Sequence, residues 1–175
     1  AKVNSVTLTG AGSSAAARKE AKRGEIAAAA SLFARELQNL PANVLTPREF
    51  AKRARKVGSA SPRISVKVHG RKDLERMGAG SLLGVALGSP QEPQLVHLKY
   101  RPAGRAQGRI ALVGKGLTFD TGGISIKPSG GMQDMKFDMC GAAAVLAAFH
   151  ALALGAECAY EVHGVLGCVE NMPDG

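Results

Sequence analysis

The sequence has few cysteines and no pattern that would pair them. Its three cysteines, Cys140, Cys158 and Cys168, are odd in number and form no Cys-x-x-Cys motif. Small secreted proteins usually carry an even set of cysteines that cross-links the chain, and many zinc modules carry closely spaced pairs. Both classes are therefore disfavoured, and a reducing, cytoplasmic setting is expected.

Long apolar runs are missing as well. No stretch of 18 consecutive apolar residues occurs, and residues 1–24 lack the apolar centre of a signal peptide and end in a basic cluster. Neither a membrane span nor secretion is therefore expected. Hydrophobic residues nevertheless make up 45% of the chain and charged residues 21%, which is typical of a folded globular protein rather than a disordered one.

Aromatic residues are scarce, at 4%, whereas basic residues are plentiful and give a net charge of +9. The basic clusters RKEAKRG (18–24) and KRARK (52–56) could contact nucleic-acid phosphates, but single-strand binding usually also needs aromatic side chains for stacking. A solvated helix face is the simpler interpretation, and nucleic acid stays a weakly supported alternative partner. Residues 111–175 are acidic instead, which suggests a carboxylate-bearing site there.

The order of the expected elements indicates an α/β fold. Alternating or continuous apolar residues predict strands, and capping residues such as Thr46, followed by Pro47, predict helix starts. A strand, a loop of about 20 residues, a helix and a further strand predict a βαβ unit, and hence a mostly parallel sheet flanked by helices. Strands are expected over residues 63–70, 94–100, 109–116 and 160–170, and helices over 13–40, 46–57, 72–77 and 141–154.

Four ionisable residues gather between the third strand and the last helix: Lys115, Asp120, Lys127 and Asp138. Strand C-termini and helix N-termini are where parallel sheets bind ligands. Carboxylates there suit divalent cations, and a lysine can ligate as the neutral amine, whereas a charged lysine can polarise a carbonyl. The alternative is that the two aspartates only cap a turn and a helix. A phosphate loop is disfavoured because no Gly-x-x-x-x-Gly-Lys-Ser/Thr motif occurs.

The sequence of this region also resembles that of a known protein family. The segments VGKGLTFDTGGISIKPSGGMQDMKFDMCGAAAV (113–145) and GVLGCVENMPDG (164–175) resemble the metal-site region of the leucyl aminopeptidases, the binuclear-zinc M17 peptidases. Upstream, ARELQNLPANVLTPREFA (34–51) resembles the junction between the two domains of that family. The resemblance implies that residues 1–40 end an N-terminal domain with an interdomain helix. Residues 41–175 would then be the N-terminal portion of a zinc-dependent exopeptidase-like catalytic domain.

The resemblance also implies a role for each candidate residue. Lys115 and Asp138 would bind the more loosely held of two metal ions, and Asp120 would bridge both. Lys127 would be the catalytic lysine that contacts the scissile carbonyl, and Lys127 and Asp138 would also contact substrate. The implied cofactors are two divalent ions, zinc or manganese, with bicarbonate as a possible further one. The implied reaction releases N-terminal amino acids, of leucine type, from peptides in a cytoplasmic homohexamer.

A second signature of the family, Asn-Thr-Asp-Ala-Glu-Gly-Arg, does not occur in these 175 residues. It supplies further metal ligands, so we expect this chain alone to be inactive and to be a piece of a complete aminopeptidase. Two alternatives stay open: a catalytically incomplete scaffold or complex subunit derived from such an enzyme, and a basic nucleic-acid-associated protein.

Overall fold

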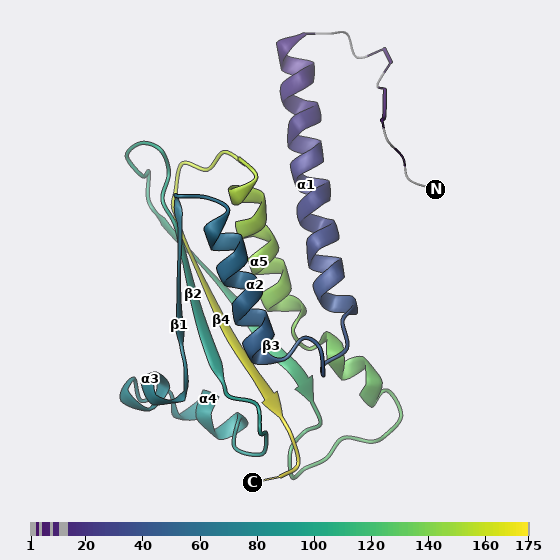
Figure 1. Cartoon of the computed structure of the whole chain (residues 1–175), viewed down its shortest axis with the longest axis vertical. Helices are drawn as coiled ribbons and strands as arrows, with labels where there is room; N and C mark the ends of the chain where they lie inside the picture. The colour runs from purple at the N-terminus through teal and green to yellow at the C-terminus, as the bar shows by residue number, and fades with distance from the viewer. Residues whose placement is uncertain (1–2, 4, 8, 11–13, 175) are drawn as a thin grey trace.

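A four-stranded sheet with helices packed against it forms the centre of the structure (Figure 1). The computed structural model describes residues 3, 5–7, 9–10 and 14–174. The elements, in chain order, are α1 (Ala15–Asn39), α2 (Pro47–Ser59), β1 (Ile64–His69), α3 (Arg71–Arg76), α4 (Gly80–Val85), β2 (Gln94–Tyr100), β3 (Arg109–Asp120), the 3₁₀ helix η1 (Met132–Phe137), α5 (Cys140–Ala153) and β4 (Glu161–Asn171).

The predicted α/β class is confirmed, but the strand directions differ in part from the expectation. The strand order is β1-β2-β4-β3, and only β3 and β4 pair in parallel. The other two pairings, β1 with β2 and β2 with β4, are antiparallel. The reason lies in the connections. The crossover helix α5 returns the chain to the end where β3 began, whereas α3 and α4 join β1 and β2 at one end of the sheet.

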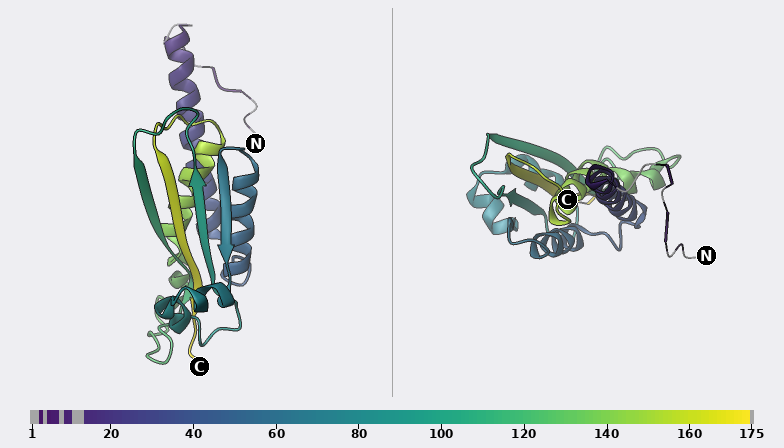
Figure 2. Two further views of the ribbon diagram at one scale, coloured as in Figure 1. Left: turned by 90° about the vertical axis from the view of Figure 1, so that its left-hand side faces the viewer. Right: turned by 90° about the horizontal axis from the view of Figure 1, so that it is seen from above.

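The larger helices lie on one side of the sheet (Figures 1 and 2). Helices α2 and α5 pack against that face, and α1 packs along the outside of α5. The core between them is built largely from fully buried side chains such as Phe50, Leu98, Leu146, Phe149 and Leu166. The short helices α3 and α4 lie near the end of the sheet where the chain terminates (Figure 2).

Helix α1 follows the predicted span closely. The Ser14 hydroxyl accepts a hydrogen bond from the backbone N–H of Ala17 and so caps the first turn. The helix runs through Gly24 without a break and ends before Pro41. Its apolar residues pack towards α5, where the Phe33 ring lies 4.6 Å from the ring of His150. Residue 13, also expected in this helix, lies outside the described residues.

Helix α5 is apolar on nearly every side because it lies between α1 and the sheet. It approaches the strands closely at two glycines. A Cβ on Gly114 would lie 2.6 Å from the Cα of Ala142, and one on Gly164 would lie 2.6 Å from Phe149 Cε2. The segment Met132–Ala153 is long and apolar enough to cross a membrane by length and composition alone, a test that core helices also pass.

Candidate metal centre at the end of β3

A β-bulge in β3 sets the direction of the candidate site residues. Lys115 pairs with Gly167 of β4, and Asp120 pairs with Asn171. Lys115 and Asp120 are five positions apart on β3, whereas their partners on β4 are only four positions apart. The extra residue is Thr118. Side chains alternate between the faces of a sheet with a period of two, so an even number of steps on β4 places both residues on one face. The bulge therefore turns Asp120 to the side that carries Lys115.

Lys115 forms an ion pair with Asp138, the residue between η1 and α5. Its Nζ lies 2.7 Å from Asp138 Oδ1, and the lysine side chain is 57% exposed against 21% for the aspartate. A Cβ on Gly141 would lie 3.1 Å from the backbone N of Lys115, so the start of α5 lies directly against β3. The parallel crossover thus brings together two residues that are 23 positions apart in the sequence.

Lys127 forms a second ion pair, with Asp120. Its Nζ lies 2.7 Å from Asp120 Oδ2 and 3.0 Å from the sulfur of Met135. The backbone N–H of Lys127 donates to the carbonyl of Thr121 over 2.8 Å, which closes a short loop after β3. Gly122 turns this loop with a φ of +91°, in the left-handed region that glycine tolerates. The loop therefore folds Lys127 back onto the strand end.

Asp120 accepts hydrogen bonds at both carboxylate oxygens. Oδ1 accepts from the backbone N–H of Gly122 at 2.9 Å and from Asn171 Nδ2 at 2.7 Å, while Oδ2 accepts from Lys127. Burial alone raises the pKa of Asp120. The hydrogen bonds from Lys127, Gly122 and Asn171 and the positive charge of Lys127 outweigh it and lower the pKa to about 2. The group is therefore an anion at every ordinary pH, as a metal ligand must be.

The residues present fit a divalent cation. Asp138 Oδ2 is buried and has no hydrogen-bond partner among the described residues. Such an oxygen is costly to bury unless something satisfies it. Two carboxylates and an amine make a mixed oxygen and nitrogen donor set that transition-metal dications accept. Within the described part of the chain, no group of three or more His, Cys, Asp or Glu side chains could hold a metal, so Lys115 would have to be a ligand.

The structure thus joins the four predicted residues into two ion pairs, Lys115 with Asp138 beside the middle of β3 and Lys127 with Asp120 at its end. Prediction from the sequence missed Asn171, whose amide holds Asp120. A signal for it existed, because it ends the strand that runs parallel to β3, and such strand ends meet at the same edge of a sheet. The structure also places the sulfur of Met135 against Lys127 Nζ.

The chain matches a known protein family over most of its length. Residues 32–175 match the model of the cytosol aminopeptidase family, catalytic domain. The chain belongs to the cytosol aminopeptidase family. This confirms the resemblance found in the sequence. The match begins within α1, and the expected domain boundary between residues 40 and 41 stays a prediction.

Named relatives support the same family. The chain is 52% identical over 147 residues to a probable cytosol aminopeptidase of Caulobacter vibrioides, which covers 83% of this chain and 29% of the relative. It is 48% identical to that of Methylobacterium radiotolerans, over 99% of this chain and 34% of the relative. The chain therefore spans about a third of the length of these cytosol aminopeptidases.

Two solved structures share the fold. The bottromycin maturation enzyme BotP in complex with Mn superposes with a TM-score of 0.83 at 43% identity, over 93% of this chain and 34% of BotP. A mutant of tomato leucine aminopeptidase superposes with a TM-score of 0.82 at 36% identity, over 92% of this chain and 30% of that protein.

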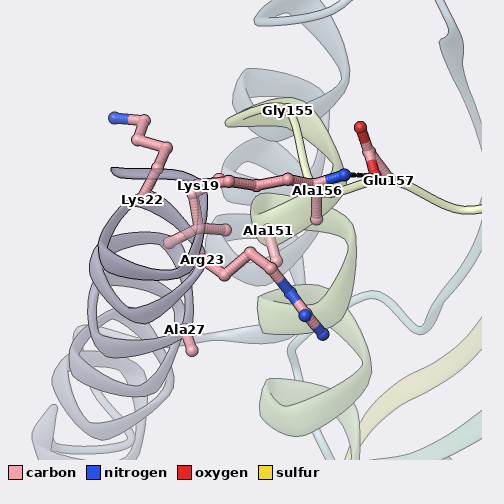
Figure 3. A pocket seen from close by; sticks show the side chains of 9 residues that line it. Lys19, Lys22, Arg23, Ala27, Ala151, Gly155, Ala156 and Glu157 are labelled. Atoms are coloured by element: carbon pink, nitrogen blue, oxygen red, sulfur yellow. Dashed lines mark ion pairs between the residues drawn. The ribbon is translucent and has the colours of Figure 1, made fainter. Parts of the chain in front are cut away.

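Two other features of this cytosol aminopeptidase family member lie away from the strand end. A hollow of about 600 Å³ separates the first turns of α1 from the end of α5 (Figure 3). Its cations pair with carboxylates: Lys19 with Glu157 at 3.1 Å (Figure 3), and Arg23 with Glu20 of the same helix. This pairing favours a solvated helix face over a phosphate-binding surface for the basic cluster 18–24.

Two histidines, His97 of β2 and His163 of β4, contact each other across neighbouring strands. His97 Nε2 and His163 Nδ1 share a hydrogen bond of 2.9 Å, and His163 contacts Glu161. Burial, followed by the charge of His163, lowers the pKa of His97. All three cysteines are free thiols, and burial raises the pKa of the core residue Cys168 to about 12.

Proposed function

We propose that this chain provides part of the active site of a metal-dependent aminopeptidase that releases N-terminal amino acids, of leucine type, from peptides. The buried, unpartnered Asp138 Oδ2 beside the amine of Lys115 is the observation that carries this proposal. The family membership supports peptide hydrolysis, and the tomato relative is named a leucine aminopeptidase. BotP, which has the same fold, is described in complex with Mn.

Lys115, Asp120 and Asp138 would hold the divalent ions, zinc or manganese. Lys115 would ligate as the neutral amine, because a nearby dication repels its proton. Asp120 would contact both ions, and its low pKa keeps it ready to bind without first losing a proton. When bound, the ions would activate a water molecule and polarise the substrate carbonyl.

Lys127 would act on the substrate rather than on the metals. Its ammonium lies 2.7 Å from Asp120 Oδ2, and about a third of the Lys127 side chain is exposed. The ammonium can therefore also donate to an incoming carbonyl oxygen. Met135, in contact with Lys127 Nζ, would line the same side of the site. Asp138 would complete the metal site and lie beside the substrate amine.

The remaining assignments follow the family. We propose a cytoplasmic homohexamer that acts on peptides, with bicarbonate as a possible further cofactor, and further metal ligands supplied by the rest of the catalytic domain. The favoured alternative is a scaffold derived from an aminopeptidase. The intact mass of the natural polypeptide separates the two, because a value far above 18.0 kDa supports the enzyme and a value at 18.0 kDa supports the scaffold.

The direct test uses the natural full-length protein and two single variants. Asp120→Ala should abolish tight Mn²⁺ or Zn²⁺ binding by calorimetry and should abolish release of leucine from a leucyl peptide. Asp134→Ala removes an exposed acid from η1 and should change neither. Unchanged metal binding in Asp120→Ala would rule out the proposed metal centre.

A further inference from the structure

We propose that Asn171 is a positioning residue that holds the Asp120 carboxylate in the orientation required for metal binding. Its Nδ2 donates to Asp120 Oδ1 over 2.7 Å, across two strands that pair in parallel. The inference rests on the proposed function, because it gives Asn171 a role towards a proposed metal ligand. It adds a residue that lies 51 positions away from that ligand in the sequence.

Asn171 is itself held firmly. Its backbone carbonyl accepts two hydrogen bonds from Thr121, one from the backbone N–H at 2.9 Å and one from the hydroxyl at 2.8 Å. The residue before it, Glu170, is buried and accepts a 2.7 Å hydrogen bond from the Ser89 hydroxyl. Hydrogen bonds from Thr121 and Ser89 therefore hold the end of β4, and they fix the backbone position from which the Asn171 side chain extends.

The contact limits how the carboxylate of Asp120 can rotate. An ionised carboxylate only accepts hydrogen bonds, so the NH₂ end of the Asn171 amide must face it. Asn171 and the N–H of Gly122 approach the same oxygen from different segments, while Lys127 holds the other oxygen. Three donors, two from the loop after β3 and one from β4, fix both the position and the plane of the carboxylate, which lowers the cost of orienting it for a cation.

The loop after β3 leaves room for this amide. A Cβ on Gly123 would lie only 2.9 Å from Asn171 Oδ1, and the φ of Gly123 is +71°, in the region that favours glycine. Asn171 is half-buried and is not part of the apolar core. Its side chain thus makes a hydrogen bond to Asp120 and does not pack in the core. Replacing it should therefore change the orientation of the Asp120 carboxylate more than the stability of the fold.

The test compares two variants of the full-length protein. Asn171→Leu keeps a side chain of similar size without a donor, and Asn171→Ala serves if the leucine disturbs folding. Arg109→Met is the matched control: it removes a side chain that donates to Glu161 between the same two strands, at the opposite end of β3 from Asp120. Calorimetry gives the affinity for Mn²⁺, and thermal unfolding without metal gives the stability of the fold.

Losing an orienting partner of a metal ligand typically weakens metal binding about 10–100-fold. We expect a loss of that order for Asn171→Leu at nearly unchanged metal-free Tm, and unchanged affinity for Arg109→Met. Wild-type affinity in a folded Asn171 variant would overturn the inference while leaving the proposed function intact. Absence of Mn²⁺ binding by the wild type, or retained binding by Asp120→Ala, would overturn the function itself.

Discussion

The register of β3 on β4 places Lys115 and Asp120 on the same face of the sheet although they are five positions apart along β3. Their partners on β4, Gly167 and Asn171, are four residues apart because Thr118 is an extra residue in the ladder. In a regular strand an odd separation would place the two side chains on opposite faces. The bulge therefore does what the proposed metal centre requires, since it lets one strand contribute two ligands to one site.

Replacing Lys127 by methionine should separate turnover from metal binding. Lys127→Met keeps the length of the side chain but removes the ammonium that contacts Asp120 and would contact the substrate carbonyl. We expect kcat to fall by about 10²–10³-fold, the usual cost of losing one donor to a developing oxyanion, with metal still bound. Steady-state kinetics and metal analysis of the full-length protein measure both quantities.

Lys136→Met is the control for this change, because Lys136 lies in η1 and its ammonium contacts the ring of Phe137 instead. It should leave kcat unchanged. Full turnover in Lys127→Met would show that the assigned role of Lys127 is wrong.

The affinity for Mn²⁺ should rise with pH, and Lys115 should account for part of that rise. A lysine ligates only after it loses a proton, so metal binding at this residue releases one. Between about pH 6 and pH 8, Lys115→Met should therefore lower the slope of log affinity against pH by about one, besides weakening binding. Calorimetry in two buffers of different ionisation enthalpy counts the released protons. An unchanged proton count in Lys115→Met would contradict neutral-amine ligation.

Adding a methyl group at Gly114 should destabilise the fold. A Cβ there would lie 2.6 Å from the Cα and 2.8 Å from the N of Ala142, and backbone atoms cannot move aside as a flexible side chain can. We expect Gly114→Ala to lower the free energy of unfolding by about 1–3 kcal/mol through overpacking of α5 on β3. Chemical denaturation measures the change.

Gly24→Ala provides a matched comparison of opposite sign. Gly24 lies inside α1, and a Cβ on it would meet nothing within 4 Å. Because alanine restricts the unfolded helix segment more than glycine, we expect a gain of about 0.5–1 kcal/mol. A gain in Gly114→Ala as well would show that α5 does not pack as closely on β3 as the structure indicates.

Glu161 should make stability depend on acid pH. Hydrogen bonds from Lys99 and then from His163 lower its pKa from 4.5 to about 2. A carboxyl whose pKa is depressed by folding stabilises the native state above its unfolded pKa and loses that contribution as pH falls through its folded pKa. The stability difference between wild type and Lys99→Met should therefore be full above about pH 5 and shrink between about pH 4.5 and pH 2.

Denaturant titrations at several pH values test this prediction. Lys67→Met is the control, because it removes a cation from β1, which pairs with β2 rather than with β4. A difference between wild type and Lys99→Met that stays constant from pH 7 to pH 2 would contradict the role of the Lys99–Glu161 pair.

Local sequence signals predicted the elements well where they were strong. Thr46 and Pro47 mark the start of α2, alternation marks β1, and the alanine-rich segment marks α5. The glycine-rich segment around Gly80 was not predicted as a helix, but it forms α4. Its glycines lower helix propensity, so the helix depends on contacts of its half-buried Leu82 and Leu83 with neighbouring elements rather than on propensity.

The sequence predicted which residues belong to the candidate site but not how they pair in space. The sequence identified Lys115, Asp120, Lys127 and Asp138, since charged residues among glycines at strand and helix ends are a local pattern. It could not assign which lysine would pair with which aspartate. That assignment depends on the loop that folds Lys127 back on Thr121 and on the crossover that places Asp138 beside Lys115.

The amino-acid sequence by itself determined the α/β class, the positions of the larger elements, the family and the four charged candidates, because each depends on residue types at short spacing. The tertiary structure alone decided that two of the three strand pairings are antiparallel, that a bulge brings Lys115 and Asp120 to one face, and that Asn171 holds Asp120. These relationships join residues far apart in the chain. Strand register and side-chain direction between such residues are settled only when the sheet is packed against its helices.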